Sequence, residues 1–221
     1  MATSAKVVGR IDRNNASDRI LNAAIALFKA RGYHGTSVRE LAQAVHIEPA
    51  SLYYHFPSKQ DILFAIFERI MDAVLDDIGD AMAGNATPEE QLRAAVRAHV
   101  LFHIARQDEA FISHSELRSL SAPNRRRIIA QRDRYERMMR TLLAAGVRTG
   151  SFEIADLQLT STAILVMCSG VSDWFVARGR LTGDMVADTY ADMAVRLVTS
   201  AGNKQAPSSA IEDSPRVPQR V

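Results

Sequence analysis

The chain has 221 residues, of which 47% are hydrophobic and 24% are charged, values typical of a globular protein of one or two domains. They exclude a wholly disordered chain and a collagen-like fibre. The single cysteine, Cys168, rules out an intrachain disulfide and fits a reducing compartment. The first residues lack the apolar segment of a secretory signal, and no apolar run could cross a bilayer. We therefore expect a cytoplasmic protein that does not associate with membranes.

Charge is distributed unevenly along the chain. The net charge is +2, but residues 1–59 hold eight Lys and Arg against four Asp and Glu, a balance of +4. Residues 60–221 hold nineteen against twenty-one, a balance of −2. A basic N-terminal quarter suggests that this end meets a polyanion, although a solvated surface can carry the same excess.

Strand signals are weak, and helical periodicity runs through nearly the whole chain. The sequence therefore predicts an all-α fold of about nine helices, three short and six mostly longer. Polar residues at the two ends predict a flexible arm over 1–13 and a disordered tail over 201–221. The expected helices cover 17–31, 37–45, 48–55, 59–82, 87–105, 108–117, 121 to 146 or 150, 156–177 and 182–199.

Two helix starts carry a strong local signal. Ser37 and Glu40 stand three residues apart, as a capping box requires. Thr87 and Glu90 have the same spacing, with a proline between them in the first turn. Both patterns satisfy amide groups that a helix leaves unpaired at its N-terminus.

The expected helices at 37–45 and 48–55 are short and joined by a tight turn, with the helix at 17–31 behind them. This arrangement is typical of a helix-turn-helix, here over about 37–56. Leu52 and Phe56 point inward on a helical wheel, which turns Tyr53 and Tyr54 outward. Exposed tyrosines fit a DNA surface, where the hydroxyl bonds phosphate and the ring packs on sugar or a thymine methyl. The alternative is that both rings pack on a neighbouring helix.

The residues of this region resemble a known family. The stretches GTSVRELA (35–42) and ASLYYHFPSK (50–59) closely resemble the signature of the TetR/AcrR family of bacterial repressors, over about residues 14–74. The resemblance implies an N-terminal three-helix DNA-binding domain over 14–74 and a helical ligand-binding and dimerisation domain over 75–200. It also implies a homodimer that binds a pseudo-palindromic double-stranded DNA operator.

By position, the resemblance also implies a set of DNA-contacting residues. Lys59, at the start of a long helix, would bind a phosphate that the helix dipole also favours, unless it is an ordinary surface cation. The second helix of the motif carries no Arg, Asn or Gln, the usual readers of base edges. His46 is expected to have a structural role. The implied contacts are Thr36, Ser37, Arg39, Pro49, Ala50, Ser51, Tyr53, Tyr54, His55 and Lys59.

The last two expected helices predict a dimer interface. The helix at 156–177 is apolar on nearly every side, and a helix of that kind must be buried all round. The following helix, 182–199, has a strong apolar stripe of its own. Together they would bury one face in their own subunit and one in a partner. The family resemblance implies the same interface, over about 156–199.

A ligand pocket between the C-terminal helices is a second implication of the resemblance. Arg132 falls on an otherwise apolar stripe, and His99 and His103 share one helix face. The alternatives are plain core packing for the apolar members and a solvent-directed Arg132. The candidate lining residues are His99, Phe102, His103, His114, Glu116, Arg118, Arg132, Tyr135, Met139, Met167 and Trp174.

Other functional classes have little support. His99 and His103 have the i, i+4 spacing of zinc ligands, with His114 as a third, but we expect wall or core histidines and no metal or cofactor. The sequence has no Gly-rich phosphate loop, no Gly-x-Ser-x-Gly and no paired cysteines, so we expect no catalytic site. The one cluster worth testing for catalysis is His99, His103 and Glu116.

A softer resemblance concerns the effector. The segments 115–118 and 132–139 look like regulators of lipid and sterol catabolism that sense acyl-CoA thioesters, and an anionic ligand would suit Arg118 and Arg132. The expected mechanism is an apo dimer that represses transcription until a ligand shifts the helix at 59–82. The alternative is an architectural DNA binder without a ligand.

Overall fold

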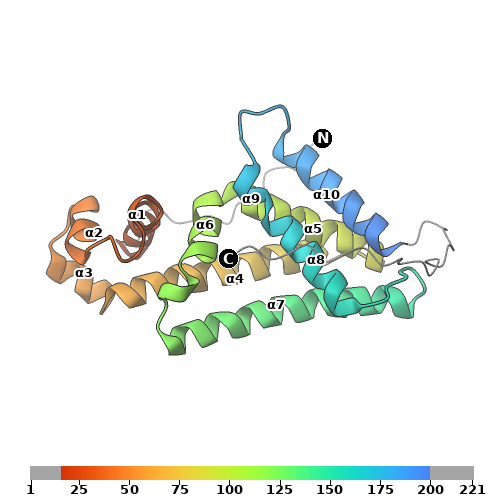
Figure 1. Cartoon of the computed structure of the whole chain (residues 1–221), viewed down its shortest axis with the longest axis horizontal. Coiled ribbons are helices and arrows are strands. Elements are labelled where there is room, and N and C mark those ends of the chain that lie inside the picture. Colours follow the sequence, from red (N-terminus) through yellow and green to blue (C-terminus); the bar gives the residue numbers. More distant parts are fainter. Residues whose placement is uncertain (1–15, 200–221) are drawn as a thin grey trace, which may run out of the picture.

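The computed structural model of the protein describes residues 16–199, and this part is helical throughout. The arm expected at 1–13 and the tail expected at 201–221 lie outside the described residues. Ten α-helices and one short 3-10 helix follow one another in this part (Figure 1). They are α1 (Ala16–Arg31), α2 (Val38–Ala44), α3 (Pro49–His55), α4 (Lys59–Met82), α5 (Pro88–Ala105), α6 (Gln107–Ser115), η1 (Leu117–Ser119), α7 (Ala122–Arg148), α8 (Leu157–Ser169), α9 (Val171–Trp174) and α10 (Gly183–Val198).

The all-α prediction is confirmed, and local sequence explains where the helices begin. Both capping boxes form: the Ser37 hydroxyl accepts the Glu40 amide, and the Thr87 hydroxyl accepts the Glu90 amide. The side chain of Asp156 accepts two amides at the start of α8. Gly150, with φ of 77°, follows the C-terminus of α7.

One predicted helix is wrong in its extent. The helix expected over 156–177 divides at Gly170 into α8 and the single turn α9, which ends at Trp174. The side chain of Gln107 donates to the carbonyl oxygens of Ser172 and Phe175, at 3.0 and 2.8 Å. This amide therefore satisfies carbonyl groups that a continuing helix would have bonded internally.

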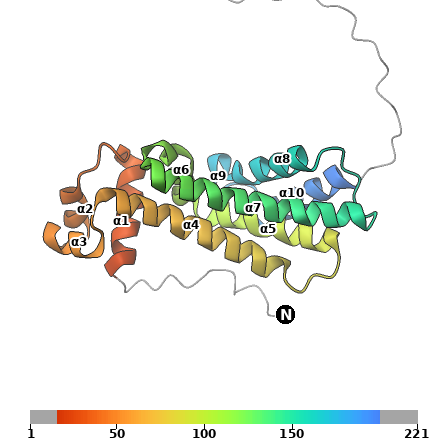
Figure 2. The ribbon, with the colours of Figure 1, turned by 90° about the horizontal axis from the view of Figure 1, so that it is seen from below.

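Figures 1 and 2 show α1, α2 and α3 gathered at one end of the molecule, α6 next to them against α1, and α5 and α7 to α10 extending toward the other end. α4 runs between the two ends without a break and packs on α1 at one end and on α5 and α7 further along. One continuous hydrophobic core extends along α4 from the N-terminal helices to the C-terminal ones. Its largest fully buried side chains include Phe28, Leu41, Leu52, Ile62, Phe67, Ile78, Leu92, Ile112 and Ile128.

Candidate DNA-binding surface and effector cavity

The tight turn between α2 and α3 is made by a non-glycine residue in the left-handed region. His46 has φ of 58°, and the amide of Ile47 returns to the carbonyl of Ala42. Leu52 is fully buried and fixes α3 against this turn. The opposite face of α3 is therefore open to solvent, with Tyr54 87% and Tyr53 49% exposed.

Other predicted contacts surround this exposed face. Ala50 and Ser51 are exposed on α3, Pro49 is half-buried at its first turn, and Arg39 is exposed on α2. His55 is half-buried, and its Nδ1 lies 3.5 Å from the Ser17 hydroxyl.

Ser37 is exposed, but its hydroxyl is used by the capping box of α2. Gln43 of α2 was not among the predicted contacts, although Arg39 of the same helix was. It lies one turn after Arg39 on α2, and both residues border the same surface hollow as Pro49 and Tyr53. The i, i+4 spacing from Arg39 was the available signal.

Two of the predicted DNA contacts have hydrogen-bond partners inside the protein. Thr36 is 1% exposed, and its hydroxyl donates to the carbonyl oxygen of Gly32 at 3.0 Å. Lys59 is half-buried, and its ammonium donates to the carbonyls of Tyr33 and Thr36 at 2.9 and 2.7 Å. Desolvation lowers the pKa of Lys59, and its Nζ lies 4.3 Å from the centre of the Tyr33 ring. Both side chains therefore donate hydrogen bonds to backbone carbonyls of the segment that follows α1, where no helix pairs these carbonyls.

The same segment is attached to the C-terminal helices through a carboxylate. Glu116, predicted for the pocket, instead accepts the backbone amide of Tyr33 at 3.0 Å and the hydroxyl of Ser119 at 2.6 Å. The amide of Gln60 donates to the Tyr33 hydroxyl at 2.8 Å and to the Ser119 carbonyl at 2.7 Å. These contacts of Tyr33, Gln60, Glu116 and Ser119 form what we call the interdomain latch.

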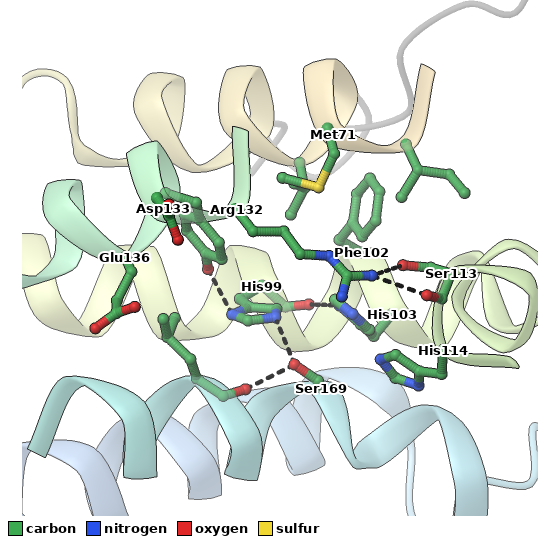
Figure 3. Close-up of a pocket in the computed structure, with 14 residues that line it drawn as sticks. Met71, His99, Phe102, His103, Ser113, His114, Arg132, Asp133, Glu136 and Ser169 are labelled. Atoms are coloured by element: carbon green, nitrogen blue, oxygen red, sulfur yellow. Dashed lines mark hydrogen bonds between the residues drawn. The ribbon is translucent and has the colours of Figure 1, made fainter. Parts of the chain in front are cut away.

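A cavity of about 250 Å³ lies between α4, α5, α6, α7 and α8 (Figure 3). Six predicted residues line it, namely His99, Phe102, His103, His114, Arg132 and Tyr135. The sequence reasoning missed the other eight, which are Ile70, Met71, Val74, Ser113, Asp133, Glu136, Leu165 and Ser169. Their apolar members are indistinguishable from core residues by periodicity, so no signal marked them.

The remaining predicted lining residues lie elsewhere. Met139 is 1% exposed in the core, and Met167 is half-buried on α8. Arg118 is exposed on η1, and Trp174 is 46% exposed on α9. None of these four, nor Glu116, is among the residues that form the cavity wall.

A chain of hydrogen bonds fixes the buried histidine of the cavity. The Ser169 hydroxyl donates to the Leu165 carbonyl at 2.7 Å, so its oxygen is left to accept from His99 Nε2 at 3.5 Å. His99 Nδ1 then accepts the hydroxyl of Tyr135 at 2.6 Å. Burial lowers the pKa of His99 well below its ordinary value and raises that of Tyr135, so both groups are neutral.

His103, His114 and Arg132 are the other nitrogen-bearing side chains that line the cavity. Nδ1 of His103 donates to the His99 carbonyl at 3.1 Å, and burial lowers the pKa of His103 to about 4. Burial also lowers the pKa of His114, with a contribution from the nearby charge of Arg132. Arg132 points into the cavity rather than to the outer surface, and its Nη2 donates to the Ser113 carbonyl and hydroxyl. Within residues 16–199 no group of His, Cys, Asp and Glu has the arrangement of a metal site.

Comparisons with known proteins identify the family. Residues 20–66 match the family described as "Bacterial regulatory proteins, tetR family", and residues 85–198 match "Tetracyclin repressor-like, C-terminal domain". The chain belongs to the TetR family. It is a helix-turn-helix transcriptional regulator that binds DNA, and the family is one of regulators rather than enzymes.

Individual TetR-family relatives match nearly the whole chain. The repressor KstR2 of Mycobacterium tuberculosis is 26% identical over 199 residues, which are 89% of this chain and 98% of the repressor. A tetR-family regulator from Rhodococcus RHA1 superposes with a TM-score of 0.79 at 30% identity, covering 85% of this chain and 98% of that one. AibR, solved in complex with isovaleryl coenzyme A and operator DNA, superposes with a TM-score of 0.73 at 30% identity and covers 80% and 96%.

This TetR-family chain has an apolar face on α8 and α10 that its own helices do not cover. Leu159 and Val166 on α8 are 67% and 66% exposed, and Leu197 on α10 is 55% exposed. Met185 and Met193 lie on the same stripe of α10 as Leu197, at i, i+8 and i+12. The expectation that α8 is buried all round therefore does not hold within one subunit. Among the described helices, none combines the length and apolar character needed to cross a membrane.

Proposed function

We propose that the protein is a homodimeric repressor that binds a pseudo-palindromic operator and releases it when a small-molecule effector enters the cavity. Residues 14–74 would bind DNA, and residues 75–200 would bind the effector and form the dimer. The observation that carries this proposal is the course of α4 (Lys59–Met82). At its first turn, Lys59 donates a hydrogen bond to the carbonyl of Tyr33, in the segment before the helix-turn-helix. Further along the same helix, Ile70, Met71 and Val74 line the cavity.

A rigid helix that touches both sites is a direct mechanical link. A ligand that displaces the middle of α4 must also move its first turn, because the helix is unbroken between them. The recognition helix α3 packs on the same N-terminal core through Leu52. We infer that a bound effector changes the spacing of the two α3 helices in the dimer. DNA reading depends on that spacing, because half-sites lie one duplex turn, about 34 Å, apart.

The uncovered face of α8 and α10 supports dimerisation through about 156–199. Exposed apolar patches of this kind on a soluble chain mark association surfaces. Two helices from each subunit would form a four-helix arrangement about a two-fold axis. The same axis would relate the two DNA-binding ends.

We propose an acyl-CoA as the class of effector to test first. AibR binds isovaleryl coenzyme A, and the cavity of this chain combines an apolar α4 wall with a guanidinium. A cavity of about 250 Å³ is smaller than the usual range for drug-sized ligands, about 300–1,000 Å³, so it would take the acyl part and leave the nucleotide outside.

Footprinting at a stated salt concentration tests the proposal. Purified protein should protect a two-fold-symmetric site in the DNA flanking its own gene, and Tyr53→Ala should weaken protection roughly tenfold to a hundredfold, as expected for a lost base or phosphate contact. An acyl-CoA panel should then release the site. Protection that no ligand relieves favours an architectural DNA binder, and salt-sensitive binding without a protected site rejects the operator proposal.

A further inference from the structure

Arg132 carries a positive charge inside the cavity that no carboxylate of residues 16–199 pairs with. Its Nη2 donates to the carbonyl and hydroxyl oxygens of Ser113, at 2.8 and 3.0 Å. Asp133 and Glu136 line the same cavity, but Figure 3 shows their carboxylates turned away from the guanidinium. Desolvation lowers the pKa of Arg132, and no opposing carboxylate offsets this effect. Arg132 is half-buried and has no counterion within residues 16–199, so an anion in the cavity would stabilise its charge.

The guanidinium also has donors to spare. Arginine has five N–H groups, and the contacts with Ser113 occupy the two on Nη2. The groups on Nε and Nη1 make no hydrogen bond within the described part of the chain, and Arg132 is one of the residues that line the cavity. A carboxylate oxygen could therefore accept a charge-assisted hydrogen bond from either nitrogen.

Two elements give the cavity an apolar lining, with Ile70, Met71 and Val74 from α4 and Leu165 from α8. The volume of about 250 Å³ equals that of roughly eight waters at about 30 Å³ each, which suits a ligand of about ten non-hydrogen atoms. The cavity thus offers a cationic hydrogen-bonding end and an apolar side in a space of that size.

We infer that Arg132 binds the carboxylate of an aliphatic acid whose hydrocarbon part packs on α4. The inference rests on the proposed function, since it assumes that this cavity receives the effector. It adds a requirement that a simple acyl-CoA does not meet, because the charges of an acyl-CoA lie on the nucleotide part. The carboxylate would belong to a free acid, or to the far end of an acyl chain that carries a second acid group.

Calorimetric titration with octanoate, octanamide and octanoyl-CoA tests this inference. The amide matches the acid in size but has no charge. We expect octanoate to bind at least about tenfold more tightly than octanamide, because charge-assisted hydrogen bonds are roughly twice as strong as neutral ones. Arg132→Gln should remove this preference and leave octanamide binding within about twofold. Arg134→Gln, at an exposed arginine of the same helix, is the matched control and should keep the preference.

Several results would overturn the inference. They are equal binding of acid and amide, a preference that survives Arg132→Gln, and octanoate that shows no Arg132-dependent binding at millimolar concentration. Arg132→Lys, which keeps the charge, should retain part of the preference and so separates lost charge from misfolding. If octanoyl-CoA releases the operator from wild type and Arg132→Gln alike, the carboxylate inference fails and the effector function stands. If octanoate binds through Arg132 and neither octanoate nor octanoyl-CoA releases the operator, the carboxylate inference stands and the acyl-effector proposal fails.

Discussion

The stability of this protein should fall as the pH is lowered, and His103 should account for a defined part of the loss. Burial lowers the pKa of His103 to about 4 in the folded state, whereas an unfolded histidine titrates near 6.5. The unfolded state therefore binds a proton that the folded state excludes, and the folded state loses stability as pH falls below about 6.5. The folded and unfolded pKa values differ by about 2.5, which corresponds to a loss of about 3 kcal/mol in the free energy of unfolding once the pH is below both values. Between pH 7.5 and pH 5 the loss is about 2 kcal/mol.

Urea unfolding at pH 7.5 and pH 5, at one protein concentration, measures this loss. His103→Asn removes the titrating group and keeps a donor for the His99 carbonyl. The variant should lose about 2 kcal/mol less than wild type between the two pH values. His46→Asn, at an exposed histidine, is the control and should lose as much as wild type. Equal losses in wild type and His103→Asn would refute the burial argument, whatever the absolute stabilities.

Three further substitutions probe other parts of the structure. His46→Gly should raise the free energy of unfolding, measured by urea titration, by up to about 1 kcal/mol. The reason is that His46 has φ of 58°, a left-handed conformation that glycine adopts without strain. A less stable variant would mean that the His46 side chain stabilises the fold by more than this strain costs. Val166→Glu should convert the dimer to a monomer, as measured by light scattering, because it puts a charge on the uncovered face of α8 and α10. Val147→Glu, at a residue of α7 that is 41% exposed, is the control and should remain a dimer. If both variants are dimers, the interface lies elsewhere. Glu116→Gln should lower the free energy of unfolding by about 1–3 kcal/mol, because the group that accepts two hydrogen bonds loses its charge. An unchanged urea midpoint would mean that the interdomain latch does not stabilise the fold.

Sequence reasoning predicted the helix-turn-helix because its signals are local. The Ser37–Glu40 capping box, the inward Leu52 and the outward Tyr54 follow from spacing within one or two turns, and the structure confirms each geometry. Among the six predicted cavity residues, His99, His103 and Arg132 are polar side chains on helix faces that are otherwise largely apolar. Periodicity can detect an exception of this kind.

Residues whose role depends on another element were not predictable in the same way. Lys59 looked like a phosphate ligand because its helix position favours anions, but carbonyls of Tyr33 and Thr36 occupy its ammonium. Glu116 looked like a cavity residue because it follows His114, yet it faces α1 after the chain turns into η1. The carbonyls at the end of α9 are bonded by Gln107, sixty-five positions before Ser172, and no short window of sequence contains both residues.

The contacts between the DNA-binding end and the cavity limit how an effector can act. The ion pairs Lys29–Asp108 and Arg69–Asp18 join α1 to α6 and α4. The first pair is exposed and contributes at most about 1 kcal/mol. The interdomain latch has two charge-assisted hydrogen bonds to Glu116, worth on the order of 2 kcal/mol each. A nearly complete switch needs an effector that binds the released state about 5.5 kcal/mol more tightly than the DNA-bound state. Any of these contacts that is lost in the switch adds to that requirement. Under the proposed function, we expect the effector to shift α4 as a body. A ligand that merely fills the cavity beside an unmoved α4 should bind without releasing the operator.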